Sequence, residues 1–152
     1  MAATQQLCTF FLNPYFFGIE VHKVQEVLRP QDITRVPLSD DVVGGLINLR
    51  GQIVTAIDLR GCLGLEASRN EGSMNVVVRT EEGAVSFLVD EIGDVVEVED
   101  GGFEPPPDTL EGPVRELVRG VYKLKDRLLI VLDTTRALRQ KNDEAALRMA
   151  TE

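Results

Sequence analysis

The chain has 152 residues, of which 43 % are hydrophobic and 27 % charged, a composition typical of a soluble globular domain with a real core. Sixteen basic residues against 25 acidic ones give a net charge of −9, which disfavours nucleic acid and anionic lipid as partners. No apolar run approaches the roughly 20 residues of a membrane span, and the N-terminus lacks the charge pattern of a signal peptide. Two cysteines, Cys8 and Cys62, are too few for a disulfide framework, so we expect reduced thiols in a cytoplasmic protein.

The N-terminal segment predicts two strands, residues 7–12 and 15–19, separated by an Asn-Pro turn. The next segment, 20–28, is ambiguous. Its apolar residues recur at helical spacing, but residues 24–28 fit equally well a strand that is entered from a single turn of helix. Segment 31–36 alternates in polarity between two prolines, and it predicts a short edge strand.

The stretch 44–60 organises the chain, because two apolar runs meet there at Arg50-Gly51 and predict a hairpin. A short helical turn or a loop is expected over 59–65, three prolines make 103–108 irregular, and Thr134 or Thr135 can cap a helix that runs to Lys141. The remaining alternating segments predict further strands, at 74–79, 84–89, 90–98, 117–124 and 128–133.

An internal repeat relates the two halves of the chain. A shift of 75 positions places Gly45 on Gly120, Ile57 on Leu132 and Asp58 on Asp133 without a gap. Further upstream, a shift of 71 places 23–27 on 94–98, and residues 7–12 have 74–79 as their counterpart. The shared order of strand, strand, variable segment, hairpin and short helix indicates a duplication.

About five short strands in about 70 residues cannot bury a flat sheet, but closing them into a small barrel removes the exposed edges. The sequence therefore predicts two small β-barrels packed on one another. The repeated halves need not coincide with the barrels, because a terminal strand is easily exchanged between neighbours.

No set of residues suited to catalysis or metal binding is recognisable. The single histidine, His22, lies beside Glu20 and Lys23 without a serine motif, and the sequence shows no zinc, calcium or phosphate-loop spacing. Asp58 and Asp133 end equivalent strands, where helix capping explains both. These observations argue against an enzyme and predict no cofactor and no metal. A barrel protein that binds a small ligand between its halves stays open as an alternative.

The two halves differ where interaction chemistry is expected. The first presents Arg50 on a glycine turn, near Val24 and Glu26, where the second has Lys125-Asp126. A guanidinium held at a turn can bind a carboxylate or carbonyl group of a partner through two hydrogen bonds, and arginine is enriched in binding hot spots.

These motifs resemble those of the CheW family of bacterial chemotaxis, and the resemblance extends from about Leu7 to Leu138. It is carried by Lys-Val-Gln-Glu-Val at 23–27, Asn-Leu-Arg-Gly at 48–51 and Ile-Asp-Leu-Arg at 57–60. It implies two five-stranded SH3-like β-barrels and a short C-terminal helix. We expect one CheW-like domain over 1–141, whose intertwined subdomains cover about 14–73 and 74–141 with possible exchange of strand 7–12, followed by a tail at 142–152.

The resemblance also implies a function. A CheW-like protein is a non-catalytic adaptor that couples the cytoplasmic tip of a chemoreceptor to the regulatory domain of the histidine kinase CheA. It would be cytoplasmic, at receptor arrays beneath the inner membrane, without nucleic acid or direct membrane contact. A pilus-motility or other non-flagellar pathway is an alternative setting. The resemblance implies receptor-binding positions at Val24, Glu26, Arg50 and Val77. Apolar residues of the variable segment are nominated for the kinase side: Ile33, Val36, Leu38 and Val42.

Overall fold

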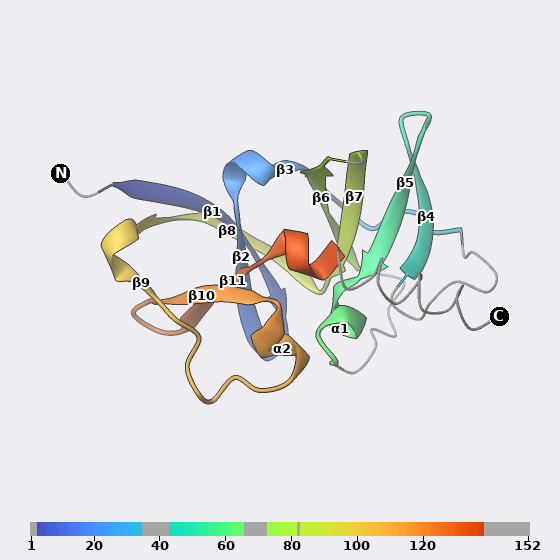
Figure 1. Cartoon of the computed structure of the whole chain (residues 1–152). Helices are drawn as coiled ribbons and strands as arrows, with labels where there is room; N and C mark the ends of the chain where they lie inside the picture. Colours follow the sequence, from blue (N-terminus) through green and yellow to red (C-terminus); the bar gives the residue numbers. More distant parts are fainter. Residues whose placement is uncertain (1–2, 35–42, 66–72, 82, 139–152) are drawn as a thin grey trace.

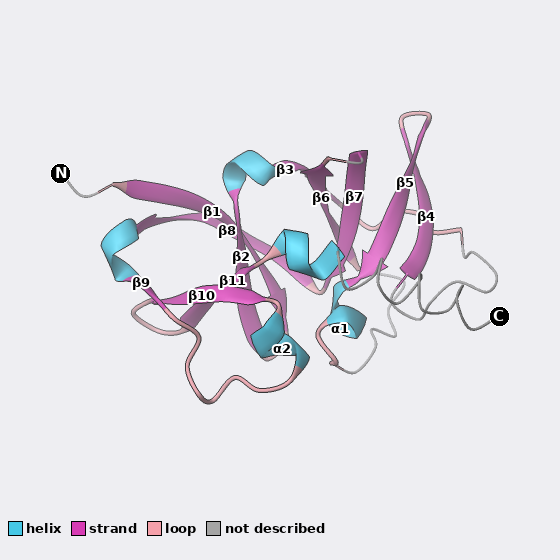
Figure 2. Ribbon diagram, in the orientation of Figure 1, coloured by secondary structure: helices cyan, strands magenta, loops and turns pink. Residues whose placement is uncertain are grey.

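A computed structural model describes residues 3–34, 43–65, 73–81 and 83–138 of the chain (Figure 1). This part consists of two β-sheets joined by short helices (Figure 2), which confirms the predicted β-rich class. The first sheet, sheet A, contains β1 (Thr4–Leu12), β2 (Tyr15–Glu20), β8 (Glu91–Glu99), β9 (Phe103–Glu104), β10 (Val118–Lys123) and β11 (Leu128–Leu132). The second sheet, sheet B, contains β3 (Val24–Leu28), β4 (Val43–Leu49), β5 (Gln52–Asp58), β6 (Met74–Thr80) and β7 (Gly83–Val89).

Short helical segments connect these strands. Residues 134–138 are helical as well, and they form part of the expected C-terminal helix. The structure resolves the ambiguity at 20–28 in favour of one helical turn followed by a strand. The named segments are η1 (Val21–Lys23), α1 (Leu59–Cys62), η2 (Asp100–Gly102) and α2 (Pro113–Glu116), and α2 was not expected from the sequence.

The two sheets share one topology. Sheet A has the order β8-β1-β2-β11-β10-β9, and sheet B has the order β3-β6-β7-β5-β4. In each sheet two antiparallel hairpins meet at one parallel pair, β2 with β11 and β7 with β5. The two-residue strand β9 adds a sixth strand to sheet A. No described pairing joins the two edge strands of either sheet, so neither barrel is closed by hydrogen bonds.

The strand registers confirm the duplication. Gly45 pairs with Ala56 and Gly120 with Val131, so both partners are displaced by 75, and the same bulge precedes each glycine. For the strands upstream of these hairpins, equivalent residues are 68 positions apart. Leu7 of β1 pairs with Val96 of β8, and the residues 68 positions away, Asn75 of β6 and Leu28 of β3, also pair. The predicted shift of 71 for residues 23–27 was therefore wrong by three residues. The alignment of 7–12 with 74–79, a shift of 67, was wrong by one residue. Valine-rich strands without turn markers leave such slips undetected in the sequence.

Each sheet combines strands from both halves of the repeat. The hairpin β1–β2 pairs with strands of the second half, and β6–β7 pairs with strands of the first half. The strands are thus distributed differently from the expected subdomains at 14–73 and 74–141, because two whole hairpins are exchanged rather than strand 7–12 alone. Sheet B is consequently contiguous between residues 24 and 89, and sheet A is built from both sides of it. The tail at 142–152 lies outside the described residues.

Three apolar clusters stabilise this arrangement. Because successive side chains of a strand point to opposite faces of the sheet, neighbouring residues of a buried strand can join different clusters. Val76 and Val78, for example, join the central cluster, whereas Val77 between them joins the inner cluster of sheet B. Ile57 and Leu132, predicted to occupy matching core sites, both lie in the central cluster. The two sheets are therefore held together by a shared core.

Close backbone crossings explain two of the repeated glycines. A Cβ on Gly45 would lie 2.5 Å from the Thr34 carbonyl oxygen, and a Cβ on Gly120 would lie 2.6 Å from that of Glu104. The segments that cross there place Ile33 and Phe103 over the two glycines, at equivalent positions of the two sheets. Only glycine accommodates such an approach.

Candidate functional site

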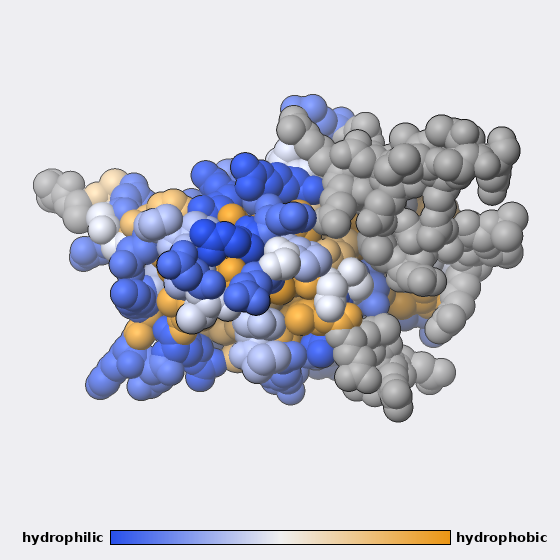
Figure 3. Space-filling view, turned by 60° about the horizontal axis from the view of Figure 1, so that its bottom comes forward, coloured by the Kyte–Doolittle hydropathy of each residue, from blue (hydrophilic) through white to orange (hydrophobic). Residues whose placement is uncertain are grey.

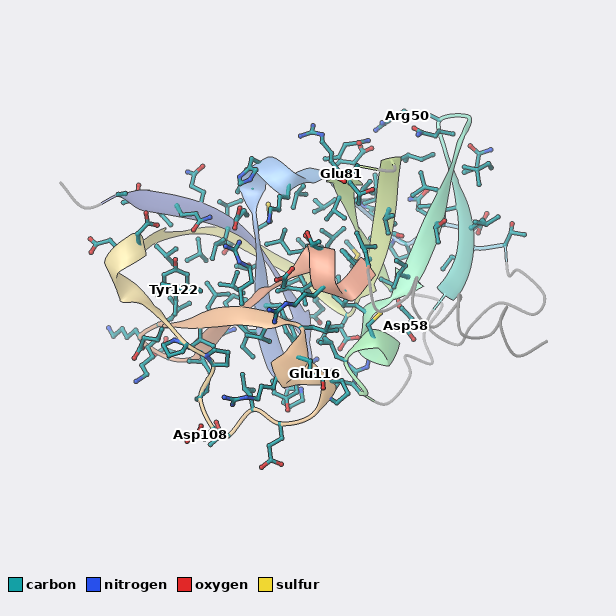
Figure 4. The ribbon with its side chains drawn as sticks, viewed as in Figure 1. Arg50, Asp58, Glu81, Asp108, Glu116 and Tyr122 are labelled. Atoms are coloured by element: carbon teal, nitrogen blue, oxygen red, sulfur yellow. The ribbon has the colours of Figure 1, made fainter. Side chains whose placement is uncertain are left out.

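The tip of the β4–β5 hairpin carries the strongest candidate residue. Arg50 has a φ of 52° and Gly51 a φ of 86°, so both residues of this two-residue turn adopt positive φ, as a hairpin with matched twist requires. The Asn48 side chain accepts a hydrogen bond from the Gly51 N–H at 2.8 Å, which fixes the turn. Figure 4 shows Arg50 at this tip, away from Asp58 at the other end of β5.

Arg50 and Glu26 form a two-point ion pair between the hairpin tip and β3. Arg50 Nη1 donates to Glu26 Oε1 at 3.0 Å, and Nη2 donates to Oε2 at 2.6 Å. The side chain of Arg50 is 71 % exposed and that of Glu26 is 20 % exposed. Hydrogen bonding to the guanidinium lowers the pKa of Glu26 and raises the pKa of Arg50. The remaining guanidinium N–H groups of Arg50 are on the exposed side of the pair, where a partner can reach them.

Of the other predicted receptor-side residues, Val24 lies near this pair and Val77 does not reach the surface. A bulge at Gln25 turns Val24 toward the central cluster, opposite Val78, while Glu26 lies opposite Val77. Val77 has an exposed fraction of 0 % and packs in the inner cluster of sheet B. A side chain without exposed surface cannot contact a partner directly.

The predicted kinase-side residues are only partly described. Ile33 is 37 % exposed and covers Gly45 at one end of sheet B. The neighbouring Thr34 is joined to Leu46 by two backbone hydrogen bonds of 2.8 Å. Val36, Leu38 and Val42 lie outside the described residues. The expected edge strand over 31–36 is reduced, within the described part, to the single bridge at Thr34.

Four further large apolar residues of the described part are exposed, and the sequence did not single them out. They are Val27, Ile53, Val95 and Phe103, and Ile53 is 62 % exposed. The 68-residue register makes Val27 equivalent to Val95, and the glycine crossings make Ile33 equivalent to Phe103. For these two pairs the duplication was the available signal, because an exposed apolar residue in one half has an exposed apolar counterpart in the other. On the face shown in Figure 3, apolar surface occurs as small areas separated by polar residues.

Polar side chains elsewhere serve the structure. Glu20 accepts a hydrogen bond from Arg119, and its carboxylate lies 3.2 Å from His22 and 3.7 Å from Lys23. Asp58 and Asp133 accept hydrogen bonds from the backbone N–H of Arg60 and Arg136, which confirms that both cap helices. Burial raises the pKa of the Asp58 carboxyl.

The described residues offer little to a metal ion or an apolar ligand. Among them, no group of three or more His, Cys, Asp or Glu side chains could hold a metal ion. A cavity of about 450 Å³ is wide open and mostly polar, whereas small-molecule sites are enclosed and predominantly apolar. It is lined by Thr4, Gln5, Gln6, Val21, His22 and Glu97. Within the described ranges, no helix has the length and apolar character needed to cross a bilayer.

Comparison with known proteins identifies the family. Residues 6–142 match the model of the CheW-like domain. A chemotaxis protein CheW of Treponema pallidum is 31 % identical over 84 % of this chain and 78 % of its own length. A chemotaxis protein CheW of Klebsiella aerogenes is 31 % identical over 94 % and 86 %. The crystal structure of the scaffolding protein TtCheW from Thermoanaerobacter tengcongensis superposes with a TM-score of 0.75 at 27 % identity, covering 87 % of this chain and 89 % of that one. The chain therefore belongs to the CheW family of chemotaxis scaffolding proteins, and it is non-catalytic.

Proposed function

We propose that this protein couples a chemoreceptor to the histidine kinase CheA, with the Arg50 hairpin tip on the receptor side and the Ile33 segment on the kinase side. The observation that carries the proposal is the conformation of Arg50. A non-glycine residue with positive φ stores backbone strain, and such strain concentrates at functional sites. The chain keeps an arginine here, although asparagine or glycine would fit the turn better.

The geometry supports a receptor-facing role for this tip. Glu26 holds the guanidinium at its exposed position through two hydrogen bonds, so little side-chain entropy is lost when a partner binds. The outward N–H groups suit carboxylate or carbonyl acceptors on a receptor helix.

Arg50→Asp tests this assignment. The substitution removes the donor fork and adds repulsion, which at an interface hot spot costs on the order of 2–4 kcal/mol. Affinity for a receptor-tip fragment, measured by titration calorimetry, should therefore fall at least about tenfold. Affinity for the kinase regulatory domain should change little, because the Ile33 segment is a separate surface.

Lys125→Asp is the matched control. Lys125 occupies the equivalent tip of the β10–β11 hairpin, 75 residues downstream, and it is exposed. This variant should bind the receptor fragment like the wild type. Unchanged receptor affinity in Arg50→Asp, with a normal melting curve, would refute the role given to Arg50. A collapsed melting curve would instead make Arg50 a structural residue.

A further inference from the structure

The interior of sheet B contains a polar pair where sheet A is apolar. Asn75 on β6 and Ser86 on β7 both have an exposed fraction of 0 %. The 68-residue register makes them equivalent to Leu7 and Gly18 of sheet A. There, a Cβ on Gly18 would lie 3.4 Å from the Leu7 Cβ, so the leucine fills the space beside the glycine. The two sheets thus use different chemistry at one buried position.

The polar pair forms a directed chain of hydrogen bonds. Ser86 Oγ donates to Asn75 Oδ1 at 2.8 Å, and Asn75 Nδ2 donates to the carbonyl oxygen of Arg29 at 3.2 Å. The serine hydroxyl therefore orients the amide, because a flipped amide would place its oxygen against the Arg29 carbonyl. The same carbonyl also accepts from Gln31 Nε2 at 2.9 Å.

Arg29 is the point at which the chain leaves sheet B. Strand β3 ends with Leu28 opposite Asn75, and the next residue but one, Pro30, has no N–H to continue the ladder. In sheet A the equivalent strand β8 continues pairing with β1 as far as Glu99. The Asn75 side chain thus binds the backbone one residue beyond the last described pair of β3 and β6, Leu28 with Asn75.

The segment 29–34 is consequently held at both ends. Asn75 holds it at Arg29, and the two hydrogen bonds between Thr34 and Leu46 hold it at the other end. Ile33 lies just before the second anchor, over Gly45. A buried polar pair is costly compared with an apolar one, and its best-attested use is to specify one conformation.

We propose that Asn75, oriented by Ser86, is a positioning residue that fixes segment 29–34 and thereby presents Ile33 to the kinase. The inference rests on the proposed function for its kinase side. Its structural side, the fixing of the segment, stands independently. Asn75 contacts no partner itself, since it has no exposed surface.

The test is the double variant Asn75→Leu with Ser86→Gly, which gives sheet B the residues of sheet A. Both side chains of the polar pair are removed together and the Arg29 carbonyl keeps its hydrogen bond from Gln31, so the protein should still fold, with a melting temperature lowered by only a few degrees because of the added glycine. Amide hydrogen exchange at Thr34 and Leu46 should become at least about tenfold faster, whereas exchange at core residues such as Val76 should not. Affinity for the kinase regulatory domain should fall about tenfold and receptor affinity should stay constant.

Ser86→Ala serves as a second variant, in case the double variant does not fold. It frees the Asn75 amide, so it should accelerate exchange at Thr34 and Leu46 to a smaller extent. Unchanged exchange at these two amides in both variants would overturn the inference, and so would faster exchange with undiminished kinase affinity when Ile33→Ala does weaken kinase binding. If Ile33→Ala leaves kinase affinity intact, the kinase side of the proposed function fails instead, and the exchange data alone decide the role of Asn75.

Discussion

At the scale of single residues, Arg50 combines two features that rarely occur together. Its backbone adopts a left-handed conformation, and among the described residues it is the one non-glycine residue with positive φ. Its side chain is nevertheless ordered by two hydrogen bonds to Glu26. The equivalent pair in sheet A would be Lys125 with Asp94, and no ion pair joins them in the described structure. The duplication therefore left a paired tip on one barrel only.

Exchanging the charges of Glu26 and Arg50 tests whether receptor binding needs the ion pair or the guanidinium at the hairpin tip. Glu26→Arg combined with Arg50→Glu can restore the ion pair, which is exposed and therefore contributes little to stability. We expect a melting temperature within a few degrees of that of the wild type. Receptor affinity should remain at least about tenfold reduced, because the exposed group is now a carboxylate. Recovery of affinity in the double variant would show that the pair matters and the guanidinium does not.

Asp58 gives a pH-dependent prediction. Burial raises its pKa above the ordinary value of 3.8, so the folded state disfavours the carboxylate. The resulting destabilisation is complete above the folded-state pKa and disappears as pH falls through it toward 3.8. Asp58→Asn, which can still cap α1, should raise the melting temperature at pH 7, by roughly 2–4 °C for each kcal/mol recovered. The gain should vanish in melting curves recorded near pH 3, and a gain that persists there would contradict this origin.

At the scale of elements, the two hairpins β4–β5 and β10–β11 are built alike in detail. Each begins with a bulge and a glycine, and each is crossed by a segment with an apolar residue over that glycine. Opposite ends of these hairpins carry different tasks. The crossed ends carry the close backbone contacts with the crossing segments, whereas the tips differ in residue type, Arg50 in one hairpin and Lys125 in the other.

Alanine substitutions test the crossings. Gly45→Ala and Gly120→Ala should each lower stability by about 2–4 kcal/mol, because the new methyl group would collide with a backbone carbonyl that cannot move aside. Gly101→Ala is the control, since nothing lies within 4 Å of its Cβ position, and it should change stability by less than about 0.5 kcal/mol. Chemical denaturation of the three variants provides the comparison. Equal free energies of unfolding for the three variants would mean that the crossing segments move aside to accommodate the methyl group.

At the scale of the whole molecule, reciprocal exchange of hairpins ties the two sheets together. The chain passes from one sheet to the other twice, between β2 and β3 and between β7 and β8, and polar contacts lie at both connections. At the connection between β7 and β8, Arg60 Nη1 donates to Asp90 Oδ2 at 2.7 Å. The same oxygen also accepts from the Asn13 N–H at 3.0 Å. On the opposite side, Arg119 binds Glu20, and Arg79 donates to the His22 carbonyl at 3.4 Å. We therefore expect the two sheets to unfold as one cooperative unit rather than as two independent domains.

Cutting the chain tests that unity. A break between Leu65 and Ser73 separates the two halves of the repeat, and neither half contains all the strands of one sheet. We expect the two purified fragments to form a 1:1 complex with a sigmoidal melting curve when mixed. Each fragment alone should lack a cooperative monomeric transition, as judged by circular dichroism and ultracentrifugation. A fragment that melts cooperatively as a monomer would contradict the need for exchange.

The sequence predicted local structure well and pairing across the molecule poorly. Strands and hairpins followed from alternation and glycine turns, and the 75-residue shift was readable because Gly45, Gly120, Asp58 and Asp133 mark equivalent positions. Arg50 and Glu26 were nominated together and do meet. The burial of Val77 depends on which face of β6 turns inward, and a run of three valines hides that alternation. The exchange of hairpins leaves no local mark in the sequence at all.

The contiguity of sheet B has a consequence for synthesis on the ribosome. Every strand of sheet B has been made once residue 89 is translated, so this sheet can form while the chain is still growing. Strands β1 and β2 are made first, yet β10 and β11, with which they share sheet A, end only at residue 132. At ~5–20 residues per second, Phe10 and Phe17 of the first hairpin therefore wait for several seconds before their final core exists. The earliest part of the nascent chain is the last to be buried, and it is the part that a chaperone would be expected to shield.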